Sequence, residues 1–268
     1  LNGIIGLVDL LAGSKIDDQQ KHYLSTIKSS SDDLLNVIND VLDLSKIESD
    51  KLELLPKKTS LPEFSKRMIT LFSERAKNKG LQLNLIIDKK IPDYVLIDEH
   101  RLSQIISNLL SNAIKFTKKG SVKLDVHVLN VINNVATLEF KIQDTGIGIP
   151  EEKQELIFNK YNQITNSNNY LLTQSGTGLG LSIAKQLTKL MEGEIGLHSK
   201  ENEGSSFWVN IEMPILNPKN TIPADVSIKN TNQYNFNVLL VDDRDVNLKV
   251  ASLMLKKLGC EVETAQNG

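Results

Sequence analysis

Three polar side chains in the segment NLLSNAIKFT, residues 108–117, have the types and spacing to bind a metal–phosphate group. In a helix, Asn108 and Asn112 lie on one face and Lys115 nearly on the same face, because residues three and four apart are neighbours. Amide oxygens and an ammonium facing one pocket suit Mg²⁺ and triphosphate oxygens, since Mg²⁺ uses few protein oxygens beside phosphate and water. The alternative is a pair of solvated asparagines on an exposed helix face, and this segment alone does not decide between the two.

A second segment, DTGIGIP at residues 144–150, directly follows a β-like run and offers a carboxylate beside two glycines. Gly146 and Gly148 leave the backbone free to turn sharply and to approach a ligand closely. Asp144 at the strand end is a suitable acceptor for an exocyclic amine such as adenine N6. A strand-to-helix turn capped by Asp144 is the simpler alternative.

A third segment, GTGLGL at residues 176–181, leads into a predicted helix. Its alternating glycines expose successive backbone amides at the helix N-terminus, which attracts phosphate. It is neither a Walker A loop, because no Gly-Lys-Ser/Thr follows, nor a Rossmann turn, because no strand closely precedes it. The polar, Asn-rich stretch 159–175 before it is typical of a mobile lid.

Alternating strands and helices are predicted to position these segments. The helical stretches are residues 62–79, 99–116, 151–158 and 179–191. The β-like runs are residues 81–88, 122–128, 135–143, 194–197 and 206–212. A short Asn-rich turn joins the second and third of these runs, which predicts an antiparallel hairpin. The expected architecture is an α/β sandwich with helices on one face of a mixed sheet.

The first fifty residues have a helical period instead. One apolar stripe ends at Gly13-Ser14, and Asp17 and Asp18 then open a second helix. The heptad seam of that helix consists of Leu24, Ile27, Ser31, Leu34, Ile38, Val41 and Ser45. So wide a stripe predicts an antiparallel helical hairpin that forms a four-helix bundle in a homodimer. Packing of the hairpin onto the rest of this chain is the alternative.

The last fifty residues begin with a linker, since residues 214–235 are rich in Pro, Asn, Thr and Ser. A buried-strand run over residues 238–241 then ends in Asp242-Asp243. A helix over residues 246–258 and a strand over 261–264 follow. This order predicts the start of a doubly wound domain.

Composition limits the classes of protein. The chain has 268 residues, 40% of them hydrophobic and 24% charged, and a formal net charge of −2, which fits a folded protein of two or more domains without a basic field for nucleic acid. Cys260 as the single cysteine excludes an intramolecular disulfide and a multi-cysteine zinc site. No apolar run approaches the roughly 18–20 residues that cross a bilayer. The start at Leu1, without methionine or signal peptide, predicts a piece of something longer.

Taken together, these segments resemble the sequence boxes of sensor histidine kinases. Residues 108–117 resemble the N box, 144–150 the G1 box and 176–181 the G2 box, and Phe158 with Tyr161 resembles the F box. The catalytic domain of these kinases has the ATP-binding fold shared with gyrase, the Hsp90 chaperones and MutL. LNGIIG at residues 1–6 and LSKIE at 44–48 resemble parts of the dimerisation hairpin of that family. VLLVDD at 238–243, followed by Asp245-Val246-Asn247, is similar to the opening of a receiver domain. The chain is thus identified as similar to part of a hybrid sensor histidine kinase.

The resemblance implies a role for each matching position. Asn112 would be the principal Mg²⁺ ligand, with Asn108 contacting metal or phosphate, while Lys115 would contact phosphates and Phe116 would pack by the adenine. Asp144 would bind adenine N6, and Gly146 and Gly148 would shape that wall of the site. The remaining ATP-binding positions would be Tyr161, Gly176, Thr177, Gly178, Leu179 and Gly180. The implied cofactors are ATP and Mg²⁺, and the implied reaction passes the γ-phosphoryl group to a histidine and then to a receiver aspartate.

The implied organisation has four parts: the dimerisation hairpin at 1–50, the catalytic domain at 51–215, a linker at 216–236 and the start of a receiver domain at 237–268. The partners would be a second copy of the chain and its own or a separate receiver or phosphotransfer protein, with no nucleic acid. These domains would be cytoplasmic, with any membrane anchor in upstream parts of the parent protein.

The chain also departs from the family pattern. The phosphorylated histidine and its neighbouring acid would precede Leu1, and the receiver phosphoacceptor would follow Gly268, so Asp242 and Asp243 would form an incomplete Mg²⁺ site. The four histidines, His22, His100, His127 and His198, are expected to be surface or packing residues. The lid has LLTQS at residues 171–175, without the basic residue often found there. The fragment is therefore expected to bind nucleotide and not to phosphorylate itself.

Two other functions remain open. A degenerate signalling scaffold would dimerise without binding ATP usefully, and the altered lid motivates that interpretation. A gyrase- or Hsp90-type ATPase would use the same fold, but those enzymes hydrolyse ATP with a glutamate on the first motif helix, where this chain has Asn108 and Asn112.

Overall fold

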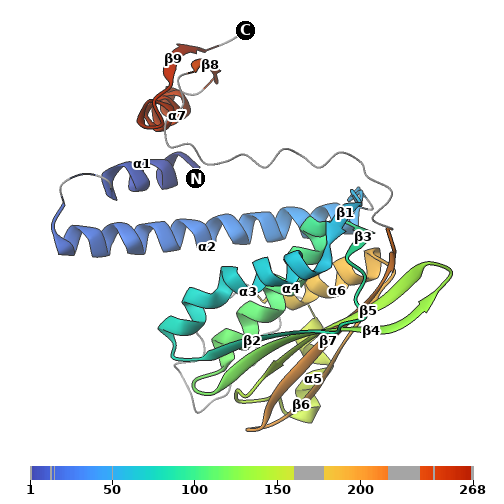
Figure 1. The fold of residues 1–268 in the computed structure, drawn as a ribbon. Helices are drawn as coiled ribbons and strands as arrows, with labels where there is room; N and C mark the ends of the chain where they lie inside the picture. The colour runs from blue at the N-terminus through green and yellow to red at the C-terminus, as the bar shows by residue number, and fades with distance from the viewer. Residues whose placement is uncertain are drawn as a thin grey trace. The chain divides into compact units, whose positions relative to one another are not determined.

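The computed structural model describes residues 2–12, 14, 16–49, 51–159, 178–216, 236–243 and 245–266 (Figure 1). The chain divides into two compact units. One unit comprises residues 1–39 and 223–268, and the other comprises residues 40–222. The second unit contains the segments predicted to bind nucleotide, so its architecture decides how they are positioned.

A five-stranded mixed sheet is the base of the 40–222 unit. Its strand order is β2 (Gln82–Ile87), β4 (Ser121–Ile132), β5 (Val135–Asp144), β7 (Gly204–Pro214) and β6 (Glu194–Lys200). β2 pairs with β4 in parallel, and every other pair is antiparallel. A separate two-stranded antiparallel sheet joins β1 (Lys57–Ser60) to β3 (Tyr94–Ile97).

Three helices cover one face of the five-stranded sheet: α3 (Leu61–Asn78), α4 (Glu99–Phe116) and α6 (Gly180–Leu190) (Figure 1). The strands alternate accordingly. Ala136, Leu138, Phe140 and Ile142 of β5 are fully buried under the helices, and the residues between them are partly exposed. This arrangement confirms the predicted α/β sandwich with helices on one face of a mixed sheet.

α4 forms the centre of the helical layer because one of its faces is entirely apolar. Leu102, Ile105, Ile106, Leu109 and Leu110 are fully buried. The helix begins where the Asp98 carboxylate accepts a hydrogen bond from the Arg101 amide at 3.1 Å, an N-cap interaction. It ends at Thr117, whose hydroxyl donates to the Ala113 carbonyl at 2.7 Å.

The first helices are α1 (Asn2–Ala12) and α2 (Asp18–Glu48), so the predicted helical hairpin is present. The apolar side chains of α2 are unevenly buried. Ile27, Leu34, Ile38 and Val41 are 40% or more exposed. Leu44, near the end of α2 and within the 40–222 unit, belongs instead to the hydrophobic core of that unit. In the described part of the chain, no helix has both the length and the apolar character needed to span a membrane.

The C-terminal elements are β8 (Asn237–Val241), α7 (Asp245–Lys257) and β9 (Glu261–Ala265). β8 and β9 pair in parallel, with Val238 beside Val262. A β-α-β unit with parallel strands is the repeating unit of doubly wound domains. The strand–helix–strand order therefore agrees with the hydrophobic pattern of the sequence.

The structure differs from the predicted elements in three places. β1 and β3 are absent from the prediction, because they are only four residues long and β1 has the polar sequence KKTS. β4 and β5 extend to the turn itself, because Asn133 and Asn134 have φ values of 49° and 64° and allow a two-residue hairpin. The predicted helix 151–158 is divided into α5 (Glu151–Gln154) and a 3₁₀ turn (Leu156–Phe158).

Candidate nucleotide-binding site

The polar face of α4 is where the predicted ligands lie. Asn108, Asn112 and Lys115 are all partly exposed. Leu109, Leu110, Ala113 and Ile114 on the other face are at most 2% exposed. The period of the helix thus separates these polar side chains from the core, as the spacing of the sequence predicts.

Asn108 joins α4 to the start of α6. Its Nδ2 donates a hydrogen bond to the Gly180 carbonyl at 3.2 Å. A Cβ at Gly180 would lie 3.1 Å from Asn108 Oδ1, which is closer than most side-chain contacts. The short distance between α4 and the start of α6 therefore favours glycine at this position. The segment 108–117 and the last residues of the segment 176–181 therefore come together, although 72 residues separate them.

The loop 144–150 meets α4 at its other end. A Cβ at Gly146 would lie 2.7 Å from the Phe116 carbonyl oxygen, so this approach requires glycine. The Gly146 amide donates to Asp144 Oδ1 at 2.8 Å and fixes the carboxylate at the end of β5. Asn108 and Phe116 are eight residues apart, about 12 Å along the helix axis, a length over which a nucleoside triphosphate can extend.

The loop 144–150 is held in place by the turn between β6 and β7. Gly148 has a φ of 64°, and a Cβ there would lie only 1.9 Å from the Lys200 carbonyl oxygen. The Ser199 hydroxyl accepts a hydrogen bond from the Ile149 amide at 2.8 Å. Gln154 Nε2 donates to the carbonyls of Ile149 and Ser199 at 3.0 and 2.9 Å. These contacts tie the loop to the end of β6 and to α5.

Burial changes the acidity of two of the site residues. It raises the pKa of the Asp144 carboxyl, while backbone hydrogen bonds from Gly146 and Ser205 act in the opposite direction. Burial also lowers the pKa of Lys115, and the nearby positive charges of Arg75 and Lys79 lower it further. A donor beside Asp144 and an anion beside Lys115 would each replace hydration that the folded protein has removed.

Lys79 and Ser199 support the site but were missed by the sequence analysis. Lys79 Nζ donates to the carbonyls of Ile114 and Lys115 at 2.8 and 2.9 Å, so it neutralises the end of α4. Ser199 orients the loop 144–150 from 50 residues away. No local pattern marks either residue, because their partners are close only in the folded chain.

Of the other residues predicted to bind ATP, the structure describes some and leaves others undescribed. Gly178 has a φ of 70°, and Leu179 is buried just before α6. Phe158 packs edge-on against Phe207, with ring centroids 6.4 Å apart. Tyr161, Gly176, Thr177 and residues 160–175 of the predicted lid lie outside the described residues.

The acidic pair Asp242 and Asp243 lies after β8 in the other unit. Asn247 Nδ2 of α7 donates to both carboxylate oxygens of Asp242, each at 3.1 Å. Among the residues that the structure describes, no group of three or more His, Cys, Asp or Glu side chains could hold a metal ion.

Comparisons with known proteins identify two domain families. Residues 97–215 match the family described as histidine kinase-, DNA gyrase B-, and HSP90-like ATPase. Residues 1–50 match the His Kinase A (phospho-acceptor) domain. The first of these matches spans the polar face of α4, the loop 144–150 and the start of α6.

Curated relatives extend this likeness along the chain. The chain is 41% identical to the signal transduction histidine-protein kinase BarA of Escherichia coli K12 over 222 residues, which are 81% of the chain and 23% of BarA. It is 35% identical to the aerobic respiration control sensor protein ArcB of the same strain over its full length, which is 34% of ArcB. The chain thus spans about a quarter to a third of these relatives.

A solved structure shares the fold. The crystal structure of full-length ShkA in complex with AMPPNP matches 99% of the chain and 52% of the ShkA chain, with a TM-score of 0.63 and 24% identity.

Proposed function

The chain belongs to the hybrid sensor histidine kinases, and we propose that its residues 51–215 bind Mg·ATP and catalyse transfer of the γ-phosphoryl group to a histidine. One observation carries the proposal. Asn108 of α4 contacts Gly180, and the end of the same helix closely approaches Gly146, so the three glycine- and amide-rich segments surround one region. The match to an ATPase family over residues 97–215 supports the choice of ligand.

The adenine end of the ligand is assigned to the loop 144–150. Asp144 accepts a hydrogen bond from the N6 amine, which compensates for the burial of its carboxylate. Gly146 and Gly148 form the wall of the adenine pocket, and Phe116 packs by the base. The resemblance also assigns Tyr161 to ATP binding, and this residue lies outside the described part of the chain.

The phosphate end is assigned to Lys115 and the start of α6. The ammonium of Lys115 is assigned to phosphate oxygens, together with the backbone amides of Gly178, Leu179 and Gly180 at the start of α6, where the helix dipole favours anions. The resemblance assigns Gly176 and Thr177 to the same end, and both lie outside the described residues.

The residues present fit Mg²⁺ held together with the phosphates. Asn112 and Asn108 offer amide oxygens, the hard ligands that this ion prefers, and the Asn108 bond to Gly180 uses only its Nδ2. Bound Mg²⁺ neutralises charge that develops on the phosphates during transfer. The contribution of the chain itself is to position the nucleotide, which is the main requirement of phosphoryl transfer.

The rest of the chain is assigned by the same resemblance. We propose that the hairpin of residues 1–50 dimerises as a four-helix bundle, and that the phosphorylated histidine precedes residue 1 in the parent protein. Residues 216–236 act as a linker, and residues 237–268 begin a receiver domain with Asp242 and Asp243 as its Mg²⁺-binding acids. These parts act in the cytoplasm.

Calorimetry of the 268-residue chain tests the nucleotide site. We expect ATP and ADP to bind more tightly with Mg²⁺ than without it, and Asn112→Ala to remove most of that difference. The AMPPNP complex of ShkA, which has the same fold, motivates AMPPNP as a third ligand. Equal binding by the wild type and Asn112→Ala in magnesium would contradict the metal assignment.

Incubation with γ-labelled ATP tests the reaction. We expect no acid-labile phosphate on the 268-residue chain, and labelled protein when a longer chain supplies the upstream histidine. Steady release of free phosphate would favour a gyrase- or Hsp90-type ATPase instead. A folded chain that binds no nucleotide would favour the dimerising scaffold that the altered lid motivates.

A further inference from the structure

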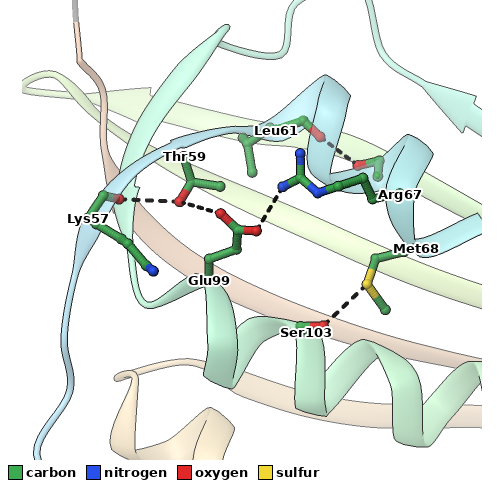
Figure 2. Close-up of polar contacts among 8 residues, drawn as sticks. Lys57, Thr59, Leu61, Arg67, Met68, Glu99 and Ser103 are labelled. Atoms are coloured by element: carbon green, nitrogen blue, oxygen red, sulfur yellow. Dashed lines mark hydrogen bonds and ion pairs between the residues drawn. The ribbon is translucent and has the colours of Figure 1, made fainter. Parts of the chain in front are cut away.

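The N-terminal turn of α4 is held by several parts of the 40–222 unit. Figure 2 shows Glu99 between Arg67 of α3, whose Nη2 lies 2.7 Å from Glu99 Oε1, and Thr59 of β1, whose hydroxyl donates to Oε2 at 3.4 Å. Asp98 uses its other carboxylate oxygen to accept from the Leu55 amide at 2.9 Å. The start of the proposed nucleotide-binding helix is thus tied to the segment that follows α2 and to β1 and α3.

The end of α2 contacts the same turn of α4 through a nearly buried ion pair. Arg101 Nη1 donates to Asp43 Oδ2 at 3.0 Å, and their side chains are only 15% and 16% exposed. Gln104 Nε2 donates to the same oxygen at 2.9 Å, and its Oε1 accepts from Arg101 Nη1 at 2.9 Å. Asp43, Arg101 and Gln104 therefore form one closed network.

The neighbours of Asp43 on α2 anchor the network in the core. Leu44 is 6% exposed and Ile47 packs against the hydrophobic core of the unit. Asp40, one turn earlier, has a pKa raised by burial and by the negative charge of Asp43. The two acidic side chains repel each other, and the cation of Arg101 lies against the Asp43 carboxylate at 3.0 Å.

The partners of Asp43 lie on the row of α4 that leads to the proposed ligands. Gln104, Asn108 and Asn112 follow one another at intervals of four, so they share one face of the helix. Any shift of α2 that displaces Gln104 along or around the α4 axis also displaces Asn108, because a helix moves as a rigid element over two turns. The contact between Asp43 and Gln104 thus lies one helical turn before Asn108, the first proposed ligand-binding residue of α4.

We propose that Asp43 is a positioning residue for phosphoryl transfer, which couples the end of α2 to the nucleotide site through Arg101 and Gln104. The inference rests on the proposed nucleotide binding by α4. Removing one partner of a nearly buried pair leaves an uncompensated charge, so the helix must move to rehydrate it. The coupling is reciprocal: nucleotide on α4 holds α2 in the same arrangement that Asp43 favours.

A charge exchange on the 268-residue chain tests the coupling. Asp43→Arg and Arg101→Asp are each expected to weaken Mg·ATP binding about fivefold or more, and the double variant D43R/R101D is expected to recover most of that loss. Asp43→Asn, which keeps the shape and removes the charge, replaces Asp43→Arg if the latter does not fold. Arg67→Ala serves as the matched control, because it breaks the exposed Glu99 pair on the same turn of α4 and is expected to change binding within about twofold.

Hydrogen exchange gives a second measurement. A contact that only stabilises the fold would not make amide exchange in α2 depend on Mg·ATP. Mg·ATP is expected to slow amide exchange at residues 40–48 in the wild type and in Arg67→Ala, but not in Asp43→Asn. If wild type and Asp43 variants bind Mg·ATP equally and show the same protection of α2, the positioning role is wrong while the nucleotide site stands. If the wild type binds no nucleotide, the proposed function itself fails.

Discussion

Burial of the Asp144 carboxyl is unfavourable for its ionised form. Asp144 is also the only acidic residue proposed to contact the adenine base. Its raised pKa means that the folded state binds a proton more tightly than the unfolded state. The resulting stabilisation is present below the ordinary pKa of 3.8 and is lost as pH rises through the raised value. At pH 7 the ionised carboxylate therefore costs stability, which is consistent with a group kept for binding.

Replacing Asp144 by asparagine separates these two effects. We expect Asp144→Asn to unfold at the same or a higher denaturant concentration at pH 7, with the difference shrinking toward pH 4. ATP affinity is expected to fall about tenfold or more, because an amide that accepts from Gly146 presents a donor to the adenine amine and loses a charged hydrogen bond. Urea titrations at both pH values and calorimetry measure the two quantities. GTP, without an N6 amine, is the control ligand, and an equal loss for GTP would contradict the assignment.

Lys115 predicts a pH dependence of opposite origin. Burial and the charges of Arg75 and Lys79 lower its pKa, so the cation is disfavoured in the folded protein until phosphate binds. Folding stability contributed by the neutral amine is present above the ordinary value of 10.5 and is lost as pH falls through the lowered one. Nucleotide affinity has the reverse trend, because phosphate selects the protonated form.

We therefore expect ATP affinity to decrease as pH rises toward the ordinary lysine value of 10.5, with uptake of a proton on binding at the alkaline end. Calorimetry in two buffers of different ionisation enthalpy measures that proton. Lys115→Arg is the control, since a guanidinium stays charged over this range. Its affinity should be nearly independent of pH, and a slope equal to that of the wild type would contradict the role of Lys115.

At the scale of elements, the sequence predicts the features that depend on the periodicity of side chains along a helix or strand. It does not predict the features that depend on contacts between residues far apart in the chain. The apolar face of α4 and the alternation of β5 follow from side chains that repeat with the geometry of each element, and both are confirmed. β1 escapes prediction because a four-residue strand is defined by its pairing with β3. The network of Asp43, Arg101 and Gln104 escapes for the same reason, since about 60 residues separate its two sides.

The candidate site shows the same division. The residue types and order of the segments 108–117, 144–150 and 176–181 suggest one ligand, and the approach of Gly146 and Gly180 to α4 supports that hypothesis. Gln154 and Ser199, which fix the loop 144–150, have no signal in the sequence. Both side chains bond backbone groups of Ile149 in the loop, and these contacts exist only in the folded chain.

The loop 144–150 offers a test at this scale through Gly148. Its φ of 64° costs a side chain about 1–2 kcal/mol, and a Cβ there would also collide with the Lys200 carbonyl at 1.9 Å. Gly148→Ala is therefore expected to destabilise the 40–222 unit by more than that amount and to weaken ATP binding. Gly80→Ala is the matched control, because Gly80 has a φ of 70° but no atom within 4 Å of the added Cβ. Denaturant titration of both variants would contradict the account if they lost equal stability.

At the scale of the whole molecule, α4 connects the end of α2 to both ends of the proposed nucleotide site. Its N-terminal turn receives the end of α2, its middle contacts the start of α6, and its last residue contacts the loop 144–150. A change at the end of α2 therefore reaches both ends of the proposed nucleotide through one rigid element.

The proposed homodimer explains the apolar side chains that α2 leaves uncovered. Ile27, Leu34, Ile38 and Val41 are 40% to 49% exposed, and their spacing places them on one stripe. Leu34 and Ile38 are already about half buried, so covering all four side chains of a dimer would contribute at most about half of 1.5–3 kcal/mol each. The variant L34E/I38E is therefore expected to be monomeric by sedimentation equilibrium at concentrations where the wild type is dimeric.

Ser29→Glu, on the opposite side of the same helix, should remain a dimer. Nucleotide affinity should be unchanged in both variants, because the proposed ATP ligands lie within residues 51–215. A monomeric wild type, or a dimeric L34E/I38E, would show that another surface covers this stripe.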